Sequence, residues 1–393
     1  MPDSKAASAK SVAKFIHLDM ARGLAALLVL LGHLRSFVFV SYADLEHHTP
    51  LDTFVWMLTG FGHQSVMVFF VLSGFFITRS IVADGRSLGF SWPVYMIKRL
   101  SRLWIVLLPC LLLTLAWDNL GIILSGTKFY TGELYSIYNS GPSVEDGGAH
   151  LDSSTFFGNL LFLQTIIVPI FGSNGPLWSL SNEFWYYVLF PLIFIGAAQK
   201  NKPLIAIVSF LAFVAVCFFI GQYILLSGLI WLGGAIVYIA YERELFASVL
   251  RTRSALVIAS LILLGALAFS KGRIGSDLVK DYAVGLGSAA LVLVLAQFEG
   301  STRAYRLLAT TLADGSYTMY LVHFSFAAFL VNCILHNQKF GATVSGYLVF
   351  IGLVTVTLAY CYAIYWLFER HTGKLRRYCL SMLKNGRRSA IGN

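Results

Sequence analysis

The sequence predicts an all-α polytopic membrane protein, and three observations lead to that fold class. Its residues are 57% hydrophobic and only 12% charged, whereas about 25% of the residues in soluble domains are charged. Apolar segments of about 20 residues, long enough for a helix to cross a bilayer, recur along the whole chain. Lys and Arg gather in alternate loops, as the positive-inside rule requires. Membrane topology therefore explains the net charge of +10, and we expect no nucleic-acid partner.

We predict ten membrane-spanning helices within one integral membrane domain, residues 17–370. The predicted spans are residues 21–41, 58–81, 103–124, 177–198, 203–220, 222–241, 254–270, 282–298, 315–335 and 344–368. The apolar segment 155–171 is short and bordered by Gly and Pro, so we expect it to be re-entrant or interfacial. We expect residues 1–16 to form a cytoplasmic tail, and residues 371–393 a basic tail that lies against anionic headgroups.

The distribution of basic residues supports this count of spans. With the N-terminus inside, 23 of the 29 Lys and Arg residues fall on the cytoplasmic side. An error in the count would reverse the assignment of every later loop and remove the asymmetry. Both termini are therefore expected in the cytoplasm, and the longest loop, about residues 125–176, is expected outside.

The first span carries polar residues at positions where they are costly. Arg22 and His33 are eleven positions apart, which is about three helical turns, so both point the same way. His33 then lies roughly 16 Å deeper than Arg22 and near the membrane midplane. An ionisable residue at that depth is a candidate for function, and Asp19 lies beside Arg22 at the entry. The alternative is a histidine that is hydrogen-bonded for packing alone.

The third span begins with two arginines one turn apart, Arg99 and Arg102. Their planar guanidinium groups suit phosphate oxygens, and Arg22, at the same depth, offers a third cation. They therefore indicate a phosphate-binding site on the cytoplasmic side. The alternative, which this stretch taken alone favours, is ordinary anchoring by positive residues.

The fourth span begins with an acid among aromatic residues, in the stretch LWSLSNEFWYY. Glu183 is expected one or two turns in from the outer surface, where a carboxylate must pair or face water. Trp178 and Tyr186 line a sugar site or form an interfacial aromatic belt, and the residues do not separate these alternatives.

The ninth span holds Tyr320 and His323 one turn apart. A catalytic role and a packing role are both open for His323. The Ser73-Gly74 pair in the second span is interpreted as a close helix contact.

Several motifs follow one another in the same order as in a known family. They are LDMARGLAALLVLLGH, FFVLSGFFI, the Arg99–Arg102 pair, LWSLSNEFWYYVLFPL and SYTMYLVHFSF. Together they resemble the acyltransferase family 3 integral membrane proteins, which carry an Arg-x10-His arrangement in the first span. The resemblance runs from about residue 17 to residue 370. Family members often have a second acid after Glu183, where this chain has Phe184.

The resemblance implies transfer of an acyl group, commonly acetyl, from cytoplasmic acyl-CoA. The acceptor would be a sugar hydroxyl on a lipid-linked or exported glycan, such as a lipopolysaccharide or an exopolysaccharide. A bacterial inner membrane, with the acceptor on its periplasmic face, is the expected setting. Some members carry an additional C-terminal esterase-like domain, and this chain is expected to be the membrane domain alone.

On this hypothesis the CoA phosphates bind Arg22, Arg99 and Arg102, and the thioester reaches His33. His33 either takes the acceptor proton as a general base or takes the acyl group and passes it on.

The other candidates are assigned roles around that centre. Glu183 orients His33 or binds the acceptor, and His323 donates a hydrogen bond to the oxyanion. The expected substrate-binding residues are Asp19, Trp178, Tyr186 and Tyr320. The five cysteines show no metal-ligand spacing, so no metal cofactor is expected.

A proton-coupled transporter or flippase is the alternative class of protein, because carriers also use intramembrane His, Arg and Glu. Carriers often show internal repeats with paired broken helices, and none is evident in this sequence. Binding of acyl-CoA from the cytoplasmic side separates the two classes, since only the enzyme requires it.

Overall fold

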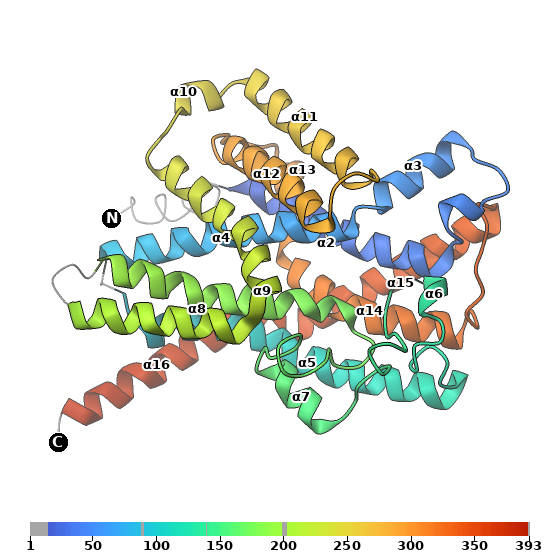
Figure 1. The fold of residues 1–393 in the computed structure, drawn as a ribbon, viewed down its shortest axis with the longest axis horizontal. Coiled ribbons are helices and arrows are strands. Elements are labelled where there is room, and N and C mark those ends of the chain that lie inside the picture. The colour runs from blue at the N-terminus through green and yellow to red at the C-terminus, as the bar shows by residue number, and fades with distance from the viewer. Residues whose placement is uncertain (1–14, 88–89, 139, 199–202, 392–393) are drawn as a thin grey trace. The chain divides into compact units, whose positions relative to one another are not determined.

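The computed structural model describes residues 15–87, 90–138, 140–198 and 203–391, so most of the predicted tail 1–16 lies outside it (Figure 1). Within these ranges the regular structure is helical and includes no β-strand, which confirms the all-α class. The α-helices are α2 (Ile16–Val38), α3 (Pro50–Thr59), α4 (Gly62–Ser87), α5 (Trp92–Ser125), α6 (Tyr135–Tyr138), α7 (Ser153–Leu160), α8 (Trp178–Ala198), α9 (Pro203–Glu242), α10 (Ala247–Leu250), α11 (Arg253–Ser270), α12 (Asp277–Leu295), α13 (Arg303–Asp314), α14 (Ser316–Cys333), α15 (Val344–Leu367) and α16 (Thr372–Ile391).

Seven helical segments of the described chain are long and apolar enough to cross a membrane. A polytopic membrane protein is therefore confirmed, while ten crossings and cytoplasmic termini remain predictions. The two predicted spans 203–220 and 222–241 form one helix, α9, which is interrupted at Gly221. Gly221 has φ +77°, a backbone conformation that glycine adopts without steric cost. The predicted boundary between the two spans thus coincides with this break.

The apolar segment 155–171 does not form a spanning helix. Its helical part, α7, has eight residues, and turns follow it. Asp152 caps α7, because its carboxylate accepts a hydrogen bond from Thr155 N at 2.9 Å. Hydrogen bonds from Ser154 and Thr155 hold the pKa of the Asp152 carboxyl below its usual range. An eight-residue helix spans too little length to cross a bilayer, as expected for this segment.

The chain divides into two compact units, and unit 1 contains residues 1–29, 60–87 and 182–316. Within unit 1, α4 packs along α9, and α11 packs along α12 (Figure 1). Gly74 on α4 and Gly234 on α9 allow this approach, because a Cβ at either position would overlap backbone atoms of the other helix. The prediction that Gly74 marks a close helix contact is therefore confirmed.

Unit 2 contains residues 30–59, 88–181 and 317–393. An aromatic cluster joins the end of α2 to α6 and α14 in its core. The ring centroid of Phe37 lies 5.4 Å from that of Tyr138 and 5.1 Å from that of Phe324. The basic tail forms the helix α16, which packs against α5.

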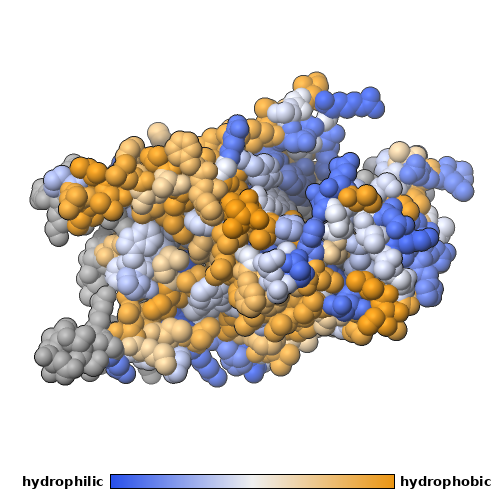
Figure 2. Space-filling model, turned by 60° about the horizontal axis from the view of Figure 1, so that its bottom comes forward, coloured by the Kyte–Doolittle hydropathy of each residue, from blue (hydrophilic) through white to orange (hydrophobic). Residues whose placement is uncertain are grey.

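Large apolar side chains cover much of the surface. Figure 2 shows one face on which hydrophobic residues spread broadly between hydrophilic ones. Phe218, Leu286 and Val344 are 86%, 73% and 78% exposed. Soluble monomers rarely expose such extensive apolar area, and the surface therefore agrees with helices that face lipid.

Lys339 binds carbonyl oxygens at the C-terminal end of α2, beyond His33. Lys339 Nζ donates a hydrogen bond to the carbonyl oxygen of Ser36, and it lies 3.3 Å from Phe39 O and 4.4 Å from the Tyr138 ring centroid. Cations stabilise the C-terminal end of a helix. Burial, together with the nearby charge of Arg35, lowers the pKa of Lys339 to about 8.

This lysine makes stability depend on pH in the alkaline range. Lysine in an unfolded chain titrates near pH 10.4, so between about pH 8 and pH 10 the unfolded state binds more protons than the folded state. The free energy of unfolding therefore rises with pH across this window. We expect the thermal unfolding midpoint in detergent to rise between pH 8 and pH 10, and to rise less in Lys339→Met. Lys128, an exposed lysine, supplies the control Lys128→Met, and equal responses in both variants would contradict the assignment.

Candidate active site

Helix α2 places His33 deep along an uninterrupted helix that also carries Arg22. The neighbouring side chains Leu30, Leu34 and Phe37 are fully buried. His33 is partly buried, and its Nδ1 atom is buried without a hydrogen-bond partner among the described residues. An imidazole nitrogen in that state is available to a substrate or a proton.

His323, on helix α14, is completely buried. His323 Nδ1 lies 2.8 Å from the carbonyl oxygen of Met319, one turn earlier in the same helix. Because a carbonyl only accepts, Nδ1 carries the hydrogen, and Nε2 of the neutral ring holds a lone pair. Nε2 is buried and has no hydrogen-bond partner in the described structure.

The two histidines meet, although 290 positions separate them in the sequence. Their ring centroids are 5.2 Å apart, and the planes are inclined by 73°. The ring of Phe324 borders both, at 5.0 Å from His33 and 6.2 Å from His323. A buried polar atom left unpaired costs about 1–3 kcal/mol, so two such nitrogens in neighbouring rings make these residues the leading candidates for a functional role. We call these two residues the histidine pair.

Glu183, on α8, belongs to a hydrogen-bond network in unit 1. Its carboxylate accepts hydrogen bonds from Ser73 Oγ at 3.0 Å and from the Tyr187 hydroxyl. Trp231 Nε1 donates to the same Ser73 Oγ at 3.1 Å. The Ser73-Gly74 pattern predicted packing alone, so this role of Ser73 was not predicted. A serine facing an acid on another helix leaves no local signal in the sequence.

The aromatic candidates are held by hydrogen bonds of their own. Tyr186 OH donates to Ile224 O at 2.8 Å. Tyr320 OH lies 2.6 Å from Ser179 Oγ and 3.1 Å from Pro176 O. Both tyrosines are buried, so their hydroxyls connect helices within the folded chain.

Trp178 is the first residue of α8 and is partly exposed. A partly exposed tryptophan at this position fits both predicted alternatives, a sugar-stacking surface and an interfacial anchor. Its role therefore remains a prediction.

The cationic candidates lie near the beginnings of α2 and α5. In unit 1, Arg22 forms an ion pair with Asp19 at 3.0 Å. In unit 2, Arg99 and Arg102 are one turn apart on α5, and the Arg99 guanidinium lies 5.3 Å from the Tyr95 ring centroid. The Arg102 side chain is exposed, which leaves it accessible to an anionic ligand from solution.

Comparison with protein families decides the class of the molecule. A family model described as an acyltransferase domain matches residues 15–366, a range that begins just before α2 and ends within α15. The chain belongs to acyltransferase family 3. No match to this acyltransferase was found among curated proteins or among solved structures.

Family membership confirms the resemblance drawn from the motifs. It favours an acyltransferase over the carrier that the intramembrane charges alone also allowed. The matched range contains every candidate residue of the sequence analysis, including the histidine pair.

Proposed function

We propose that this acyltransferase moves an acyl group, preferably acetyl, from cytoplasmic acyl-CoA to a hydroxyl of a glycan or lipid-linked saccharide. The setting is a bacterial inner membrane with the acceptor on its periplasmic face. The observation that carries the proposal is the histidine pair, in which each imidazole has a buried nitrogen with no hydrogen-bond partner among the residues that the structure describes. Such nitrogens are suited to accept the proton that an attacking hydroxyl must lose.

The proposed reaction conserves the proton. The acceptor oxygen attacks the thioester carbonyl carbon while an imidazole of the histidine pair takes the hydroxyl proton. The carbon–sulfur bond then breaks, and the CoA thiolate receives that proton, leaving acylated acceptor and free CoA. His33 is the proposed base.

His323 receives a different proposed role from the oxyanion donor of the sequence analysis. Its Nδ1 hydrogen is already donated to Met319 O, and Nε2 of the neutral ring has no hydrogen to donate. We therefore assign His323 as the second base, which shares the proton held by His33. The relay alternative, in which His33 itself carries the acyl group, uses the same pair.

We propose that Glu183, Tyr186 and Tyr320 hold neighbouring segments of the chain in position, because their side chains already form hydrogen bonds within the folded chain. Asp19 is proposed to orient Arg22 through their ion pair. Trp178 is proposed to stack on the acceptor sugar, as exposed indoles do on flat apolar faces.

The donor is proposed to bind through phosphate contacts with Arg22, Arg99 and Arg102. We expect Arg99→Gln/Arg102→Gln to weaken acetyl-CoA binding at least tenfold, since hydrogen bonds to charged groups contribute about 1.5–3 kcal/mol. The measurement is the acetyl-CoA dissociation constant of the purified protein in nanodiscs.

Arg303, an exposed arginine on α13, supplies the control variant Arg303→Gln, which should bind like wild type. An unchanged dissociation constant in the double variant contradicts the donor site. Failure of the wild type to bind any acyl-CoA contradicts the proposed function.

A further inference from the structure

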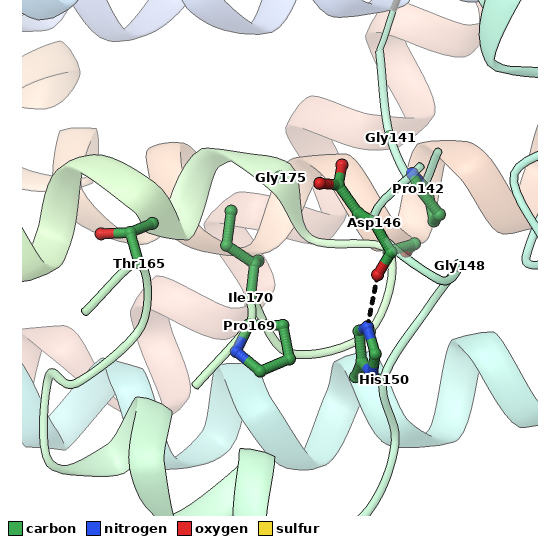
Figure 3. Close-up of a pocket in the computed structure, with 11 residues that line it drawn as sticks. Gly141, Pro142, Asp146, Gly148, His150, Thr165, Pro169, Ile170 and Gly175 are labelled. Carbon is green, nitrogen blue, oxygen red and sulfur yellow. Dashed lines mark hydrogen bonds between the residues drawn. The ribbon is translucent and has the colours of Figure 1, made fainter. Parts of the chain in front are cut away.

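An open cavity of about 270 Å³ lies in the long loop before α8, within unit 2 (Figure 3). We call it the loop cavity. Its principal lining side chains are Pro142, Asp146, His150, Thr165, Pro169 and Ile170. Ligand sites commonly measure about 300–1,000 Å³, so this cavity has room for a single small ring.

The lining combines polar groups with apolar surface. His150 Nε2 donates to the backbone oxygen of Asp146 at 2.8 Å, as Figure 3 shows, which leaves Nδ1 of the neutral ring as an acceptor. The Asp146 carboxylate accepts a hydrogen bond from Ser143 Oγ at 2.5 Å, and its two oxygens can accept several. Thr165 adds a hydroxyl at the other end (Figure 3). Among the described lining residues the charge is negative, and no Lys or Arg is present.

Buried polar residues hold the cavity wall in place. Asp118 on α5 accepts hydrogen bonds from Ser173 N at 2.6 Å and from Ser173 Oγ at 2.7 Å. Asn159 donates to Pro169 O at 2.9 Å and accepts from Phe171 N at 3.1 Å. A wall fixed before the ligand arrives reduces the entropy cost of binding.

A hydrogen bond also connects the cavity wall to α14, the helix that carries His323. Asn174 Nδ2 donates to Leu321 O at 2.8 Å, two residues before His323. On another side, a Cβ built on Gly141, which lines the cavity, would lie 3.6 Å from Phe324 Cζ. Phe324 in turn borders both rings of the histidine pair. Phe324 therefore links the lining of the loop cavity to the histidine pair.

We propose that the loop cavity binds one uncharged sugar unit of the acceptor and excludes acidic sugars. The carboxylate of Asp146 and Nδ1 of His150 accept hydrogen bonds from sugar hydroxyls, and the two prolines with Ile170 contact the ring face. A uronic acid would bring its carboxylate against that of Asp146, where like charges repel. This inference rests on the proposed function for the identity of the acceptor.

A glycine in the lining permits a direct test by filling the cavity. A Cβ on Gly175 would meet no atom of the described residues within 4 Å, so Gly175→Leu adds a side chain without a clash at Cβ. A Cβ on Gly341, in the loop between α14 and α15, would lie 4.0 Å from Thr343 Cγ2, its one neighbour within that distance among the described residues. Gly341→Leu is therefore the matched control. Asp146→Asn removes the charge and keeps one carbonyl oxygen as acceptor.

The probes are methyl glycosides of glucose, galactose and N-acetylglucosamine, with methyl glucuronide as the acidic probe. Saturation-transfer NMR on the protein in nanodiscs measures their binding without requiring turnover. We expect at least one neutral glycoside to bind the wild type and Gly341→Leu and to lose binding in Gly175→Leu. We expect methyl glucuronide to bind the wild type at least tenfold more weakly, and Asp146→Asn to reduce that difference.

Equal glycoside binding in Gly175→Leu and Gly341→Leu overturns the proposal, and so does equal or tighter binding of the glucuronide by the wild type. Acetyl-CoA affinity is measured on the same samples. If acetyl-CoA binds but no neutral glycoside does, the loop-cavity assignment fails and the proposed function stands; if acetyl-CoA does not bind, the proposed function fails.

Discussion

His33→Ala is expected to reduce acyl transfer at least about 10³-fold while the protein still inserts in the membrane and binds acetyl-CoA. Proton transfer by a positioned side chain contributes about 10²–10⁴-fold to a rate, and His33 Nδ1 is buried with no hydrogen-bond partner in the described part of the chain. The measurement is single-turnover transfer from labelled acetyl-CoA to glycan in nanodiscs. His47, which is exposed, supplies the control His47→Ala, which should retain wild-type activity.

A double variant that also replaces His323 tests whether the two histidines act together. If the histidine pair acts as one unit, the double variant His33→Ala/His323→Ala should lose little more activity than either single variant, because coupled catalytic residues are not additive. Strictly multiplicative losses would show that the two rings act independently. Normal transfer by His33→Ala would contradict the proposed chemistry altogether.

Labelled acetyl-CoA without acceptor distinguishes the two routes through His33. Label retained by the wild-type protein and absent from His33→Ala indicates an acyl-enzyme relay. Saturable binding without covalent label indicates direct transfer, with His33 as general base.

Gly234→Ala is expected to destabilise the protein strongly, whereas Gly233→Ala should be neutral or slightly stabilising. A Cβ at Gly234 would overlap the Val71 carbonyl oxygen and lie 3.0 Å from Phe75 N, while a Cβ at Gly233 would meet no atom of the described chain within 4 Å. Overpacking costs about 1–3 kcal/mol and more when backbone must move, whereas alanine at an open helical site is favourable by about 1 kcal/mol.

The comparison uses thermal unfolding of both variants in the same detergent. Because the two glycines are adjacent in α9, both substitutions change helix propensity equally, and the difference between them reports the contact with α4. Equal midpoints would contradict the close approach of α4 and α9.

Periodicity and composition predicted much of the helical architecture. A membrane-spanning helix needs a long apolar segment, and such segments can be recognised directly in the sequence. The break at Gly221 was predictable as a boundary for the same reason. The helix α16 was not predicted, because its residues are largely basic and polar and form no apolar span. Its packing on α5 is a tertiary contact that the sequence pattern does not report.

The candidate site was predictable residue by residue but not as an arrangement. His33 and His323 each stood out as a polar residue in an apolar helix, yet their contact depends on tertiary packing. No sequence pattern predicted the loop cavity, because turn residues such as Pro142 and Pro169 show no periodicity. Asp118 escaped notice because its partner, Ser173, lies in a distant loop.

The hydrogen bond from His323 to Met319 O has a consequence for how the enzyme can diversify. In a Ser-His-Asp triad a third side chain fixes the tautomer of the histidine, but here the backbone of α14 fixes it. Backbone atoms persist through every substitution that leaves the helix intact. On the proposed mechanism, the tautomer of His323 is therefore unaffected by sequence change in the surrounding loops, and loop mutations can alter acceptor preference without altering the proposed acid–base chemistry.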